Sequence, residues 1–209
     1  LFAQEDEQDN GSWELIDTET QPIPRHENGF VQLNGQFYLI GGRNLRPINI
    51  YDPVTNVWQP GAPPPIELHH IQAIAYEDEI WVVNAYTGRC CSEESGTEII
   101  YIYSPEQDAW RMGPQIPEEF RRGAAGVVLH DGIFYIAGGL DGGHGSSTTT
   151  AFATFSSYDL TTDEWTVLPE MPRARDHFTP VVVDNKLYAI GGRNTSQTIW
   201  ADVIAEVDV

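Results

Sequence analysis

Arginine recurs at one fixed distance ahead of a repeated Gly-Gly pair. Sixteen residues before the first glycine of each pair, or before Asn84 where the glycines are replaced, stand Arg25, Leu68, Arg122 and Arg175. A guanidinium stays charged at all ordinary pH values, and its planar fork matches the two oxygens of a carboxylate. Three such groups brought together would bind an acidic ligand. The other interpretation is that each arginine pairs with an Asp or Glu of a neighbouring repeat as a structural clamp, and the sequence leaves both open.

More basic side chains lie beside these arginines. The resulting set of candidate ligand-binding residues is Arg25, His69, His70, Arg121, Arg122, Arg173, Arg175 and His177. A catalytic alternative uses three consecutive residues: Arg175 would hold a substrate carboxylate, while Asp176 and His177 act as general acid and base. No nucleophile elbow, phosphate-binding loop or HExxH motif accompanies them. The sequence therefore favours binding over catalysis.

The Gly-Gly pairs belong to a longer phrase that occurs four times. It consists of a two-residue turn, an aromatic-bearing apolar run, Gly-Gly, a Tyr, a polar turn and a Trp, and the fourth copy stops before the polar turn and the Trp. The second copy is degenerate, with Asn84-Ala85 in place of the glycines, and the fourth has Val207 where we expect the Tyr. Successive Trp residues at 13, 58, 110 and 165 are 45, 52 and 55 residues apart. Such a period predicts a repeat architecture.

The local pattern predicts β-structure throughout. Asn34-Gly35 and Asp184-Asn185 each separate two apolar runs, as expected of tight hairpins whose turn residues take positive φ. No segment shows a sustained apolar rhythm of three to four residues, so no long helix is expected. Each repeat then reads as four strands. Glycine inside a strand indicates a close approach of two backbones, and we expect a neighbouring aromatic side chain there.

These repeats resemble the kelch repeat, whose blades run at about 50 residues. The resemblance implies an all-β propeller of four-stranded blades with the inner strands around a central axis. It also implies that Arg25, Arg122 and Arg175 rim the central funnel, because kelch adaptors that bind acidic peptides use arginines in this region. The approximate repeats are 25–66, 67–117, 118–172 and 173–209.

The number of blades stays open. Residues 11–18 resemble the Trp strand, the outermost strand of a repeat, but the other three strands do not precede them. We expect them to supply the missing Trp strand of the last repeat. Residues 1–10 read as a disordered acidic lead. The chain is then a closed four-bladed propeller, half of a dimeric propeller, or part of a longer parent chain with six or seven blades.

Charge narrows the classes of partner. The chain carries 31 acidic and 11 basic side chains, a net charge of -20. Phosphate binding needs clustered Lys and Arg, so nucleic acid is an unsuitable partner for this acidic protein. No apolar run approaches the roughly 18 residues of a membrane span.

Cys90 and Cys91 are the two cysteines of the chain and are adjacent. They form either a vicinal disulfide in an oxidising compartment or two free thiols. Neither a second Cys pair nor histidines at ligand spacing follow, and His144 alone is weak evidence for a metal, so we expect no metal and no cofactor. Two glycosylation sequons and the start Leu1-Phe2-Ala3-Gln4 favour a secreted or periplasmic location.

The sequence therefore predicts a non-catalytic binding propeller, with a carbohydrate or an acidic peptide or small anion in an arginine-rimmed funnel. The alternative is a sugar-modifying enzyme, similar to an epimerase or mutarotase, that uses the same funnel. Likeness to the galactose-oxidase-like kelch superfamily covers the scaffold only. Its copper enzymes need two Tyr, two His and a Cys cross-linked to one Tyr, and no such set can be assigned here.

Overall fold

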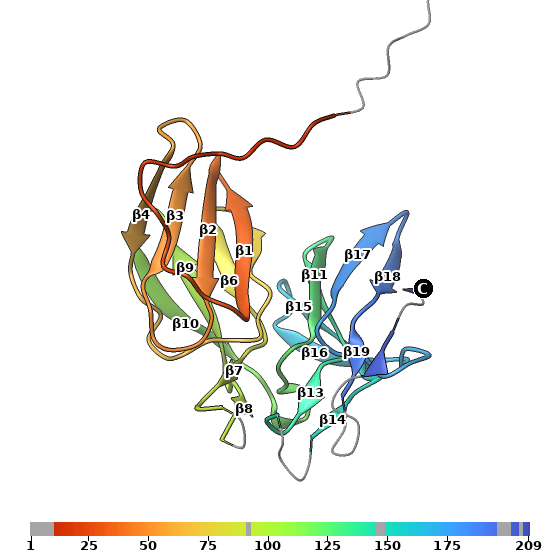
Figure 1. Cartoon of the computed structure of the whole chain (residues 1–209). Coiled ribbons are helices and arrows are strands. Elements are labelled where there is room, and N and C mark those ends of the chain that lie inside the picture. The colour runs from red at the N-terminus through yellow and green to blue at the C-terminus, as the bar shows by residue number, and fades with distance from the viewer. Residues whose placement is uncertain (1–10, 91–92, 145–148, 196–201, 205–206) are drawn as a thin grey trace, which may run out of the picture.

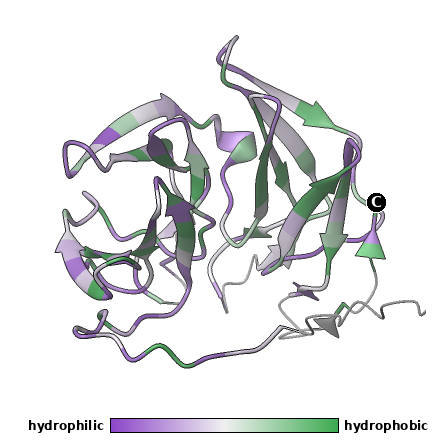
Figure 2. Cartoon of the chain, turned by 90° about the horizontal axis from the view of Figure 1, so that it is seen from above, coloured by the Kyte–Doolittle hydropathy of each residue, from purple (hydrophilic) through white to green (hydrophobic). Residues whose placement is uncertain are grey.

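A computed structural model describes residues 11–90, 93–144, 149–195, 202–204 and 207–209, which form four antiparallel sheets in chain order. Blade 1 contains β1 (Asn28–Leu33), β2 (Gln36–Gly41), β3 (Ile48–Asp52) and β4 (Val57–Gly61). Blade 2 contains β5 (Ile74–Tyr76), β6 (Glu79–Val82), β9 (Ile99–Ser104) and β10 (Ala109–Gln115). The predicted propeller of four-stranded blades is confirmed, and the blades stand around a common axis (Figures 1 and 2).

Blade 3 contains β11 (Gly126–His130), β12 (Ile133–Ala137), β15 (Phe155–Asp159) and β16 (Glu164–Leu168). Blade 4 has three described strands, β17 (Thr179–Val183), β18 (Lys186–Ile190) and β21 (Val207–Asp208). Three short ladders lie below the blades: β7 (Tyr86–Thr87) with β8 (Ser95–Gly96), β13 (Leu140–Asp141) with β14 (Thr150–Ala151), and β19 (Arg193–Asn194) with β20 (Asp202–Val203).

Helix is confined, in the described part of the chain, to one short 3-10 turn, η1 (Glu118–Phe120). No helix there is long and apolar enough to cross a membrane.

The two-residue turns adopt the geometry that their sequences predict. Asn34 and Gly35 have φ of 50° and 81°, and Asp184 and Asn185 have 50° and 58°. Positive φ at both positions matches the right-handed twist of the flanking strands. The turn thereby fixes the register of each hairpin, with Leu33 opposite Gln36 and Val183 opposite Lys186.

A tyrosine and a tryptophan from neighbouring strands pack together in three blades. The ring centroids are 5.0 Å apart for Tyr51 and Trp58, and again 5.0 Å for Tyr158 and Trp165. The tyrosine hydroxyl donates to the turn residue five positions later, for example from Tyr158 to Asp163 Oδ1 at 2.7 Å. This hydrogen bond satisfies the one polar atom of a ring that otherwise packs in the core.

The glycine pairs bring adjacent blades into backbone contact. A Cβ on Gly138 would lie 2.2 Å from the carbonyl oxygen of Arg175 in the next blade, and one on Gly41 would lie 2.3 Å from that of Leu68. The following glycine, Gly139, donates its N–H to the same Arg175 carbonyl at 2.9 Å. The nearest neighbour is thus a backbone carbonyl, where we expected an aromatic side chain.

A second set of backbone hydrogen bonds joins the blades at the axis. Four residues occupy the same place, fourteen positions before each Gly-Gly pair or its stand-in, and we call them the axial residues: Glu27, His70, Ala124 and His177. His70 N–H donates to Glu27 O at 2.9 Å, Ala124 N–H to His70 O at 3.0 Å, and His177 N–H to Ala124 O at 2.9 Å. All four have φ between 54° and 59°. One local backbone geometry therefore links all four blades.

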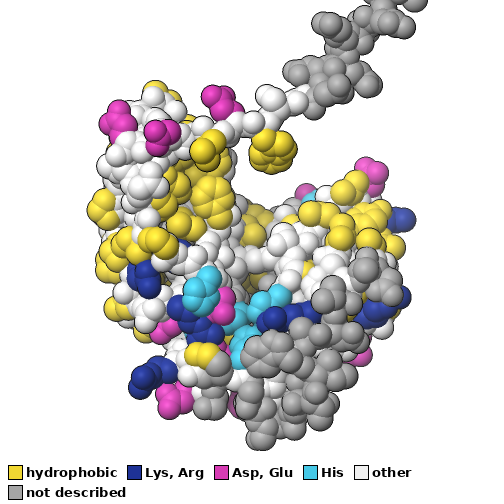
Figure 3. Space-filling model, in the orientation of Figure 1, with side chains coloured by type: hydrophobic (Ala, Val, Ile, Leu, Met, Phe, Trp, Pro, Cys, Tyr) yellow, Lys and Arg dark blue, Asp and Glu magenta, His cyan; other side chains and the backbone are white. Residues whose placement is uncertain are grey.

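The arc of blades is open between blade 4 and blade 1. β1 packs beside β5, β5 beside β11, and β11 beside β17. Among the described residues, no backbone hydrogen bond joins blade 4 to blade 1. The space-filling surface is deeply hollowed on this side (Figure 3).

The predicted closing strand is not formed. Residues 11–18 have no strand, and Trp13 and Leu15 are fully or almost fully exposed. The chain instead follows the free edge of β4, where Thr20 Oγ1 both accepts from Trp58 N–H and donates to Trp58 O, each at 2.7 Å. The segment is thus held by blade 1 and covers its outer edge. The predicted acidic lead, 1–10, lies outside the described residues.

The register of blade 4 also corrects the assignment of Val207. Asp208 lies opposite Ala189, two residues before the glycine pair, as Ser156 lies opposite Ile136 in blade 3. The Tyr position, two residues further on, would be residue 210. Val207 is therefore not the counterpart of the tyrosines, and Asp208 occupies the position of Ser156.

We predict that alanine at Gly138 destabilises the fold far more than alanine at Gly132. Both glycines have positive φ, 59° and 77°, but a Cβ on Gly132 meets nothing within 4 Å. Gly132→Ala should lower the free energy of unfolding by about 1 kcal/mol through backbone strain alone. Gly138→Ala adds the clash with Arg175 O and should cost about 1–3 kcal/mol more. Chemical denaturation measures both, and equal losses would contradict a close contact between blades.

Candidate functional site

The three repeated arginines are structural clamps inside their blades. Arg25 donates to Gly41 O at 3.0 Å and to Asn49 Oδ1 at 2.5 Å. Arg122 donates to Ile136 O at 2.9 Å and to Ser156 Oγ at 2.8 Å. In each case the guanidinium ties the entrance of the inner strand to the second strand and to a polar side chain on the third.

Arg175 makes the same connection in blade 4. It donates to Gly191 O at 2.6 Å and to Asp208 Oδ2 at 2.6 Å, and its side chain is fully buried. Burial also lowers the pKa of Arg122 to about 10. None of the three arginines lines the central cavity described below. The three arginines are therefore structural, but each acts within its own blade, and of the three Arg175 alone pairs with an acid. The expected pairing with a neighbouring blade's Asp or Glu and the expected place on the funnel rim are both wrong.

Two other predicted arginines also lie away from the axis. Arg121 donates to Ile116 O at 2.8 Å and pairs with Glu98. Arg173 pairs with Asp208 and has a side chain that is 44% exposed. Of the predicted ligand-binding set, His70 and His177 alone line the central cavity, with His69 buried directly behind them.

The central cavity has a volume of about 400 Å³ and is lined by residues of all four inner strands and their entrances. All four axial residues line it, together with apolar side chains such as Phe30, Ile71 and Phe178. The side chain of Gln72 spans its wall: Gln72 Nε2 donates to Phe178 O at 2.7 Å, and Gln72 Oε1 accepts from Val127 N–H at 2.5 Å. One end of the cavity is therefore apolar, and the axial histidines form the other.

Histidines and charged groups from several loops converge at that polar end (Figure 3). We define the axial cluster as Glu27, Arg43, His69, His70, Glu94, His144, Asp176, His177 and Arg193. Arg43 joins Glu27 to Glu94, and Arg193 donates from Nε to Asp176 Oδ1 at 3.0 Å. His144 donates from Nδ1 to Glu94 Oε2 at 2.9 Å.

Burial and hydrogen bonding set the ionisation of this cluster. Burial, followed by the nearby His177 and His69, lowers the pKa of His70 far below its usual value, so its ring is neutral at pH 7. Burial by itself would raise the pKa of Asp176, but hydrogen bonds from His177 and the Thr195 N–H outweigh it and lower that pKa. Glu94 likewise has a lowered pKa despite burial, because His144 and Arg43 donate to it.

The cluster carries more negative than positive charge when its histidines are neutral. Its fixed charges are the two guanidiniums of Arg43 and Arg193 and three carboxylates, Glu27, Glu94 and Asp176. Both guanidiniums are already engaged with these carboxylates. An added cation would suit this end of the cavity better than an added anion.

Four of the nine residues of this cluster were not identified from the sequence: Glu27, Arg43, Glu94 and Arg193. The spacing of sixteen residues points to Arg25, Arg122 and Arg175, whereas the axial residues stand fourteen positions before the glycine pairs or Asn84. Arg43 and Arg193 stand two positions after the first glycine of their pairs, and that regular spacing could have identified them. Glu94 and His144 come from loops outside the repeat, and no spacing predicts them.

Of the two cysteines of the predicted disulfide, Cys90 is among the described residues. Among the described residues no cysteine is a free thiol. Cys91, the proposed partner of Cys90, lies outside the described residues, so the vicinal pairing stays a prediction.

Comparison with known proteins agrees with the fold. The family model described as the kelch motif matches residues 121–172 and 174–201. Kelch-like protein terF of Aspergillus terreus is 28% identical over 88% of this chain and 43% of its own length. Kelch-like protein 40 of Xenopus tropicalis is 25% identical over 84% of this chain and 28% of its own length. The chain thus spans less than half the length of these curated relatives.

A solved structure titled "Structure of YjhT" is similar with a TM-score of 0.63, covering 88% of this chain and 80% of that one. Its sequence identity is 12%, so the likeness concerns the fold. The residues that the kelch motif matches belong to blades 3 and 4. Blade 2, with its degenerate pair, is recognised through the longer alignments to the curated relatives.

We predict that Arg122→Ala destabilises the protein by about 3 kcal/mol, because it removes two buried hydrogen bonds and leaves a cavity. Arg121→Ala is the matched control. The Arg121 side chain is 28% exposed and its ion pair with Glu98 lies at the surface, so the loss should stay within about 1 kcal/mol. Thermal or urea unfolding compares the two. A mild effect at Arg122 would return that residue to the candidate ligand site.

Proposed function

Because this chain is a kelch-repeat β-propeller, we propose that it is a protein-interaction propeller that receives an apolar segment of a partner protein between blades 4 and 1. The observation that carries the proposal is the open side of the arc. There β1 and β17 border the central cavity, and no backbone hydrogen bond joins their blades in the described part of the chain. The segment would cover surfaces that the described residues leave in contact with solvent.

Apolar side chains are exposed on both of these strands. Phe30 on β1 lines the cavity and is 56% exposed. On β17, Val181 and Val183 are 42% and 51% exposed and alternate with buried or half-buried residues, on the face of Thr179, which also lines the cavity. Exposed apolar patches bordered by polar residues mark interaction sites.

The backbone of both strands supports the same proposal. β1 and β17 are edge strands of their sheets, with the orders β1-β2-β3-β4 and β17-β18-β21. An unpaired strand edge is a template for an extended peptide, which gains main-chain hydrogen bonds while its alternate side chains enter the cavity.

A carbohydrate and an acidic ligand are the narrower candidates. The exposed ring of Phe30, supported by Phe37 at a centroid distance of 5.6 Å, offers a flat apolar surface on which a sugar can stack. An acidic ligand is less favoured, because the guanidiniums nearest the cavity are engaged with three carboxylates. Export stays part of the proposal, on the two glycosylation sequons of the sequence.

One observation favours the sugar-modifying enzyme as a second candidate. His177 faces the cavity and its Nδ1 donates to the buried carboxylate of Asp176, an arrangement that orients an imidazole for proton transfer. Arg175 is not part of this pair, and Arg193 holds Asp176 in its place. Incubation with a panel of free reducing sugars, followed by NMR, would reveal a changed epimer or anomer ratio only if the enzyme is present.

Selection from a displayed library of random peptides tests the interaction propeller. We expect the recovered peptides to share apolar residues at alternate positions and to bind the soluble propeller in calorimetry. Phe30→Ser should weaken their binding at least about tenfold, a loss near 1.4 kcal/mol. Val167→Ser on β16 is the control, because Val167 is 65% exposed but lies on an outer strand.

Three outcomes separate the candidates. Equal loss of peptide affinity in both variants would contradict binding at the open side. Failure to recover any peptide, together with binding on a glycan array that Phe30→Ser abolishes, would favour the carbohydrate. Turnover of a free sugar that is lost in His177→Gln would favour the enzyme.

A further inference from the structure

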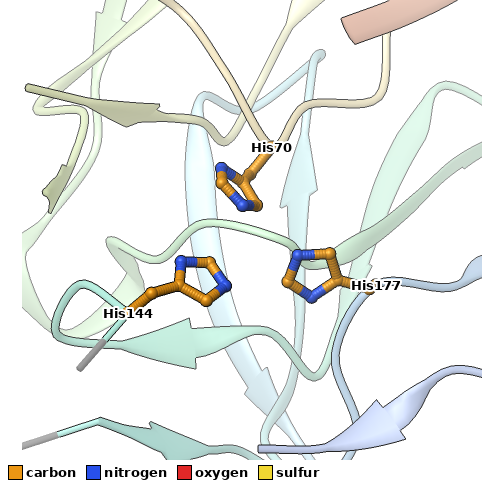
Figure 4. A group of neighbouring side chains, drawn as sticks. All are labelled: His70, His144 and His177. Carbon is orange, nitrogen blue, oxygen red and sulfur yellow. The ribbon is translucent and has the colours of Figure 1, made fainter. Parts of the chain in front are cut away.

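Three histidines from separate parts of the chain meet at the polar end of the cavity. His70 precedes β5, His144 follows β13, and His177 precedes β17 (Figure 4). Each offers one ring nitrogen, and these nitrogens all lie within 4.8 Å of one another. The ring centroids are 4.7 to 5.4 Å apart. The three imidazoles therefore surround one small space.

Carboxylates fix the orientation of two of these rings. A carboxylate can only accept, so Nδ1 of His144 donates to Glu94 and Nδ1 of His177 donates to Asp176. Each ring then keeps its lone pair on Nε2. Histidines that ligate metal ions have this arrangement: one ring nitrogen donates to a carboxylate, and the other presents its lone pair to the ion.

A positive group already lies against both lone pairs. Arg193 Nη2 is 3.2 Å from His144 Nε2 and 3.0 Å from His177 Nε2. A guanidinium has no acceptor atom, so Nε2 of His144 accepts from it. At His177 the same Nη2 is also 3.1 Å from Nδ1, so it lies beside both nitrogens of that ring. The pocket between these rings is thus built to hold positive charge.

The third ring supplies an unsatisfied nitrogen. His70 Nε2 is buried and makes no hydrogen bond, although Glu27 Oε1 lies 3.4 Å away, and the His70 side chain is 1% exposed. Buried polar atoms without a partner are rare in folded proteins. A ligand at this nitrogen would remove the deficit.

We propose that His70, His144 and His177 bind one divalent first-row transition metal ion such as Zn²⁺. Imidazole suits zinc and its neighbours, whereas Mg²⁺ and Ca²⁺ prefer oxygen. Zn–N bonds of about 2.0–2.1 Å in a tetrahedral site place ligand nitrogens roughly 3.3 Å apart, so small rotations of the rings close the site. The excess negative charge of the axial cluster favours the ion.

Such a site has three protein ligands and a fourth position open to the cavity, because His70 and His177 both line it. A three-histidine site with an open position can bind a water molecule or a ligand from the cavity. The inference does not depend on the proposed partner, since metal binding is measured on the protein alone.

Arg193 must give up its contacts with the two Nε2 atoms when the ion enters. Its side chain is 25% exposed and keeps its bond from Nε to Asp176, so the Nη2 end can turn outward. Arg193 is therefore a competitor of the ion. Its removal should strengthen metal binding, while removal of a ligand should weaken it.

The test is titration of the metal-free full chain with Co²⁺, which reports four-coordinate nitrogen ligation by its visible absorption, followed by competition with Zn²⁺. We expect one equivalent to bind. His177→Gln should weaken binding by at least about 100-fold, since loss of an outer-shell partner alone costs 10–100-fold, and Arg193→Gln should tighten it about tenfold. His130→Gln is the control, because His130 is outside the cluster and contacts Asn185.

Circular dichroism and melting curves of each variant establish that it is folded, and His144→Gln replaces His177→Gln should the latter not fold. Absence of a stoichiometric Co²⁺ complex in the folded wild-type protein would overturn the proposal. So would a complex whose affinity is the same in His177→Gln and His130→Gln. A weaker complex in Arg193→Gln would identify Arg193 as a support of the cluster and would contradict the competing-cation geometry.

Discussion

The structure depends on three backbone hydrogen bonds that run from blade to blade along the axial residues. Glu27, His70, Ala124 and His177 hold the same left-handed conformation, and the N–H of each of the last three donates to the residue before it in the set. Such a φ is unfavourable for a residue with a side chain and persists only where the surrounding structure imposes it. The clamp arginines and the glycine pairs on either side impose it here, because both fix the entrance of each inner strand.

The same constraint explains why the repeated arginines are internal. A chain entering an inner strand in an irregular conformation leaves carbonyl oxygens of the second strand without ladder partners, and Arg25, Arg122 and Arg175 donate to them. Buried backbone groups of this kind require a partner. Leu68 replaces the arginine in blade 2 and is fully buried. A protein with few basic side chains thus uses several of them inside, which leaves its outer surface still more acidic.

Much of the fold follows from the sequence because its determinants are local. Turn residues such as Asn34-Gly35, and the Tyr and Trp of each blade, act within a few residues or within one sheet, so their spacing predicts their structure. The site is different. Glu94 and His144 reach the axis from loops of unrelated length, and the destination of Arg122 depends on Ser156, which is 34 residues away. The prediction that residues 11–18 close the last repeat was wrong for the same reason. The free outer edges of blade 1 and blade 4 are both available to this segment, and the sequence does not show which of them it follows.

Blade 2 lacks several features that the other blades share. It lacks the glycine pair, the clamp arginine and the positive φ at Ala85, and both side-chain polar atoms of its Asn84 are buried without a hydrogen bond. In the same blade, His69 and His70 stand at the axis, in contact with each other through their Nδ1 atoms at 2.6 Å.

Local rules tend to fail where a function is placed. The axial backbone fixes where four side chains stand without fixing what they are, so glutamate, alanine and two histidines can share one conformation. The chemistry at this axis is therefore set by which side chains stand on the repeated backbone. Blade 2, the degenerate repeat, departs most from the sequence pattern of the other blades.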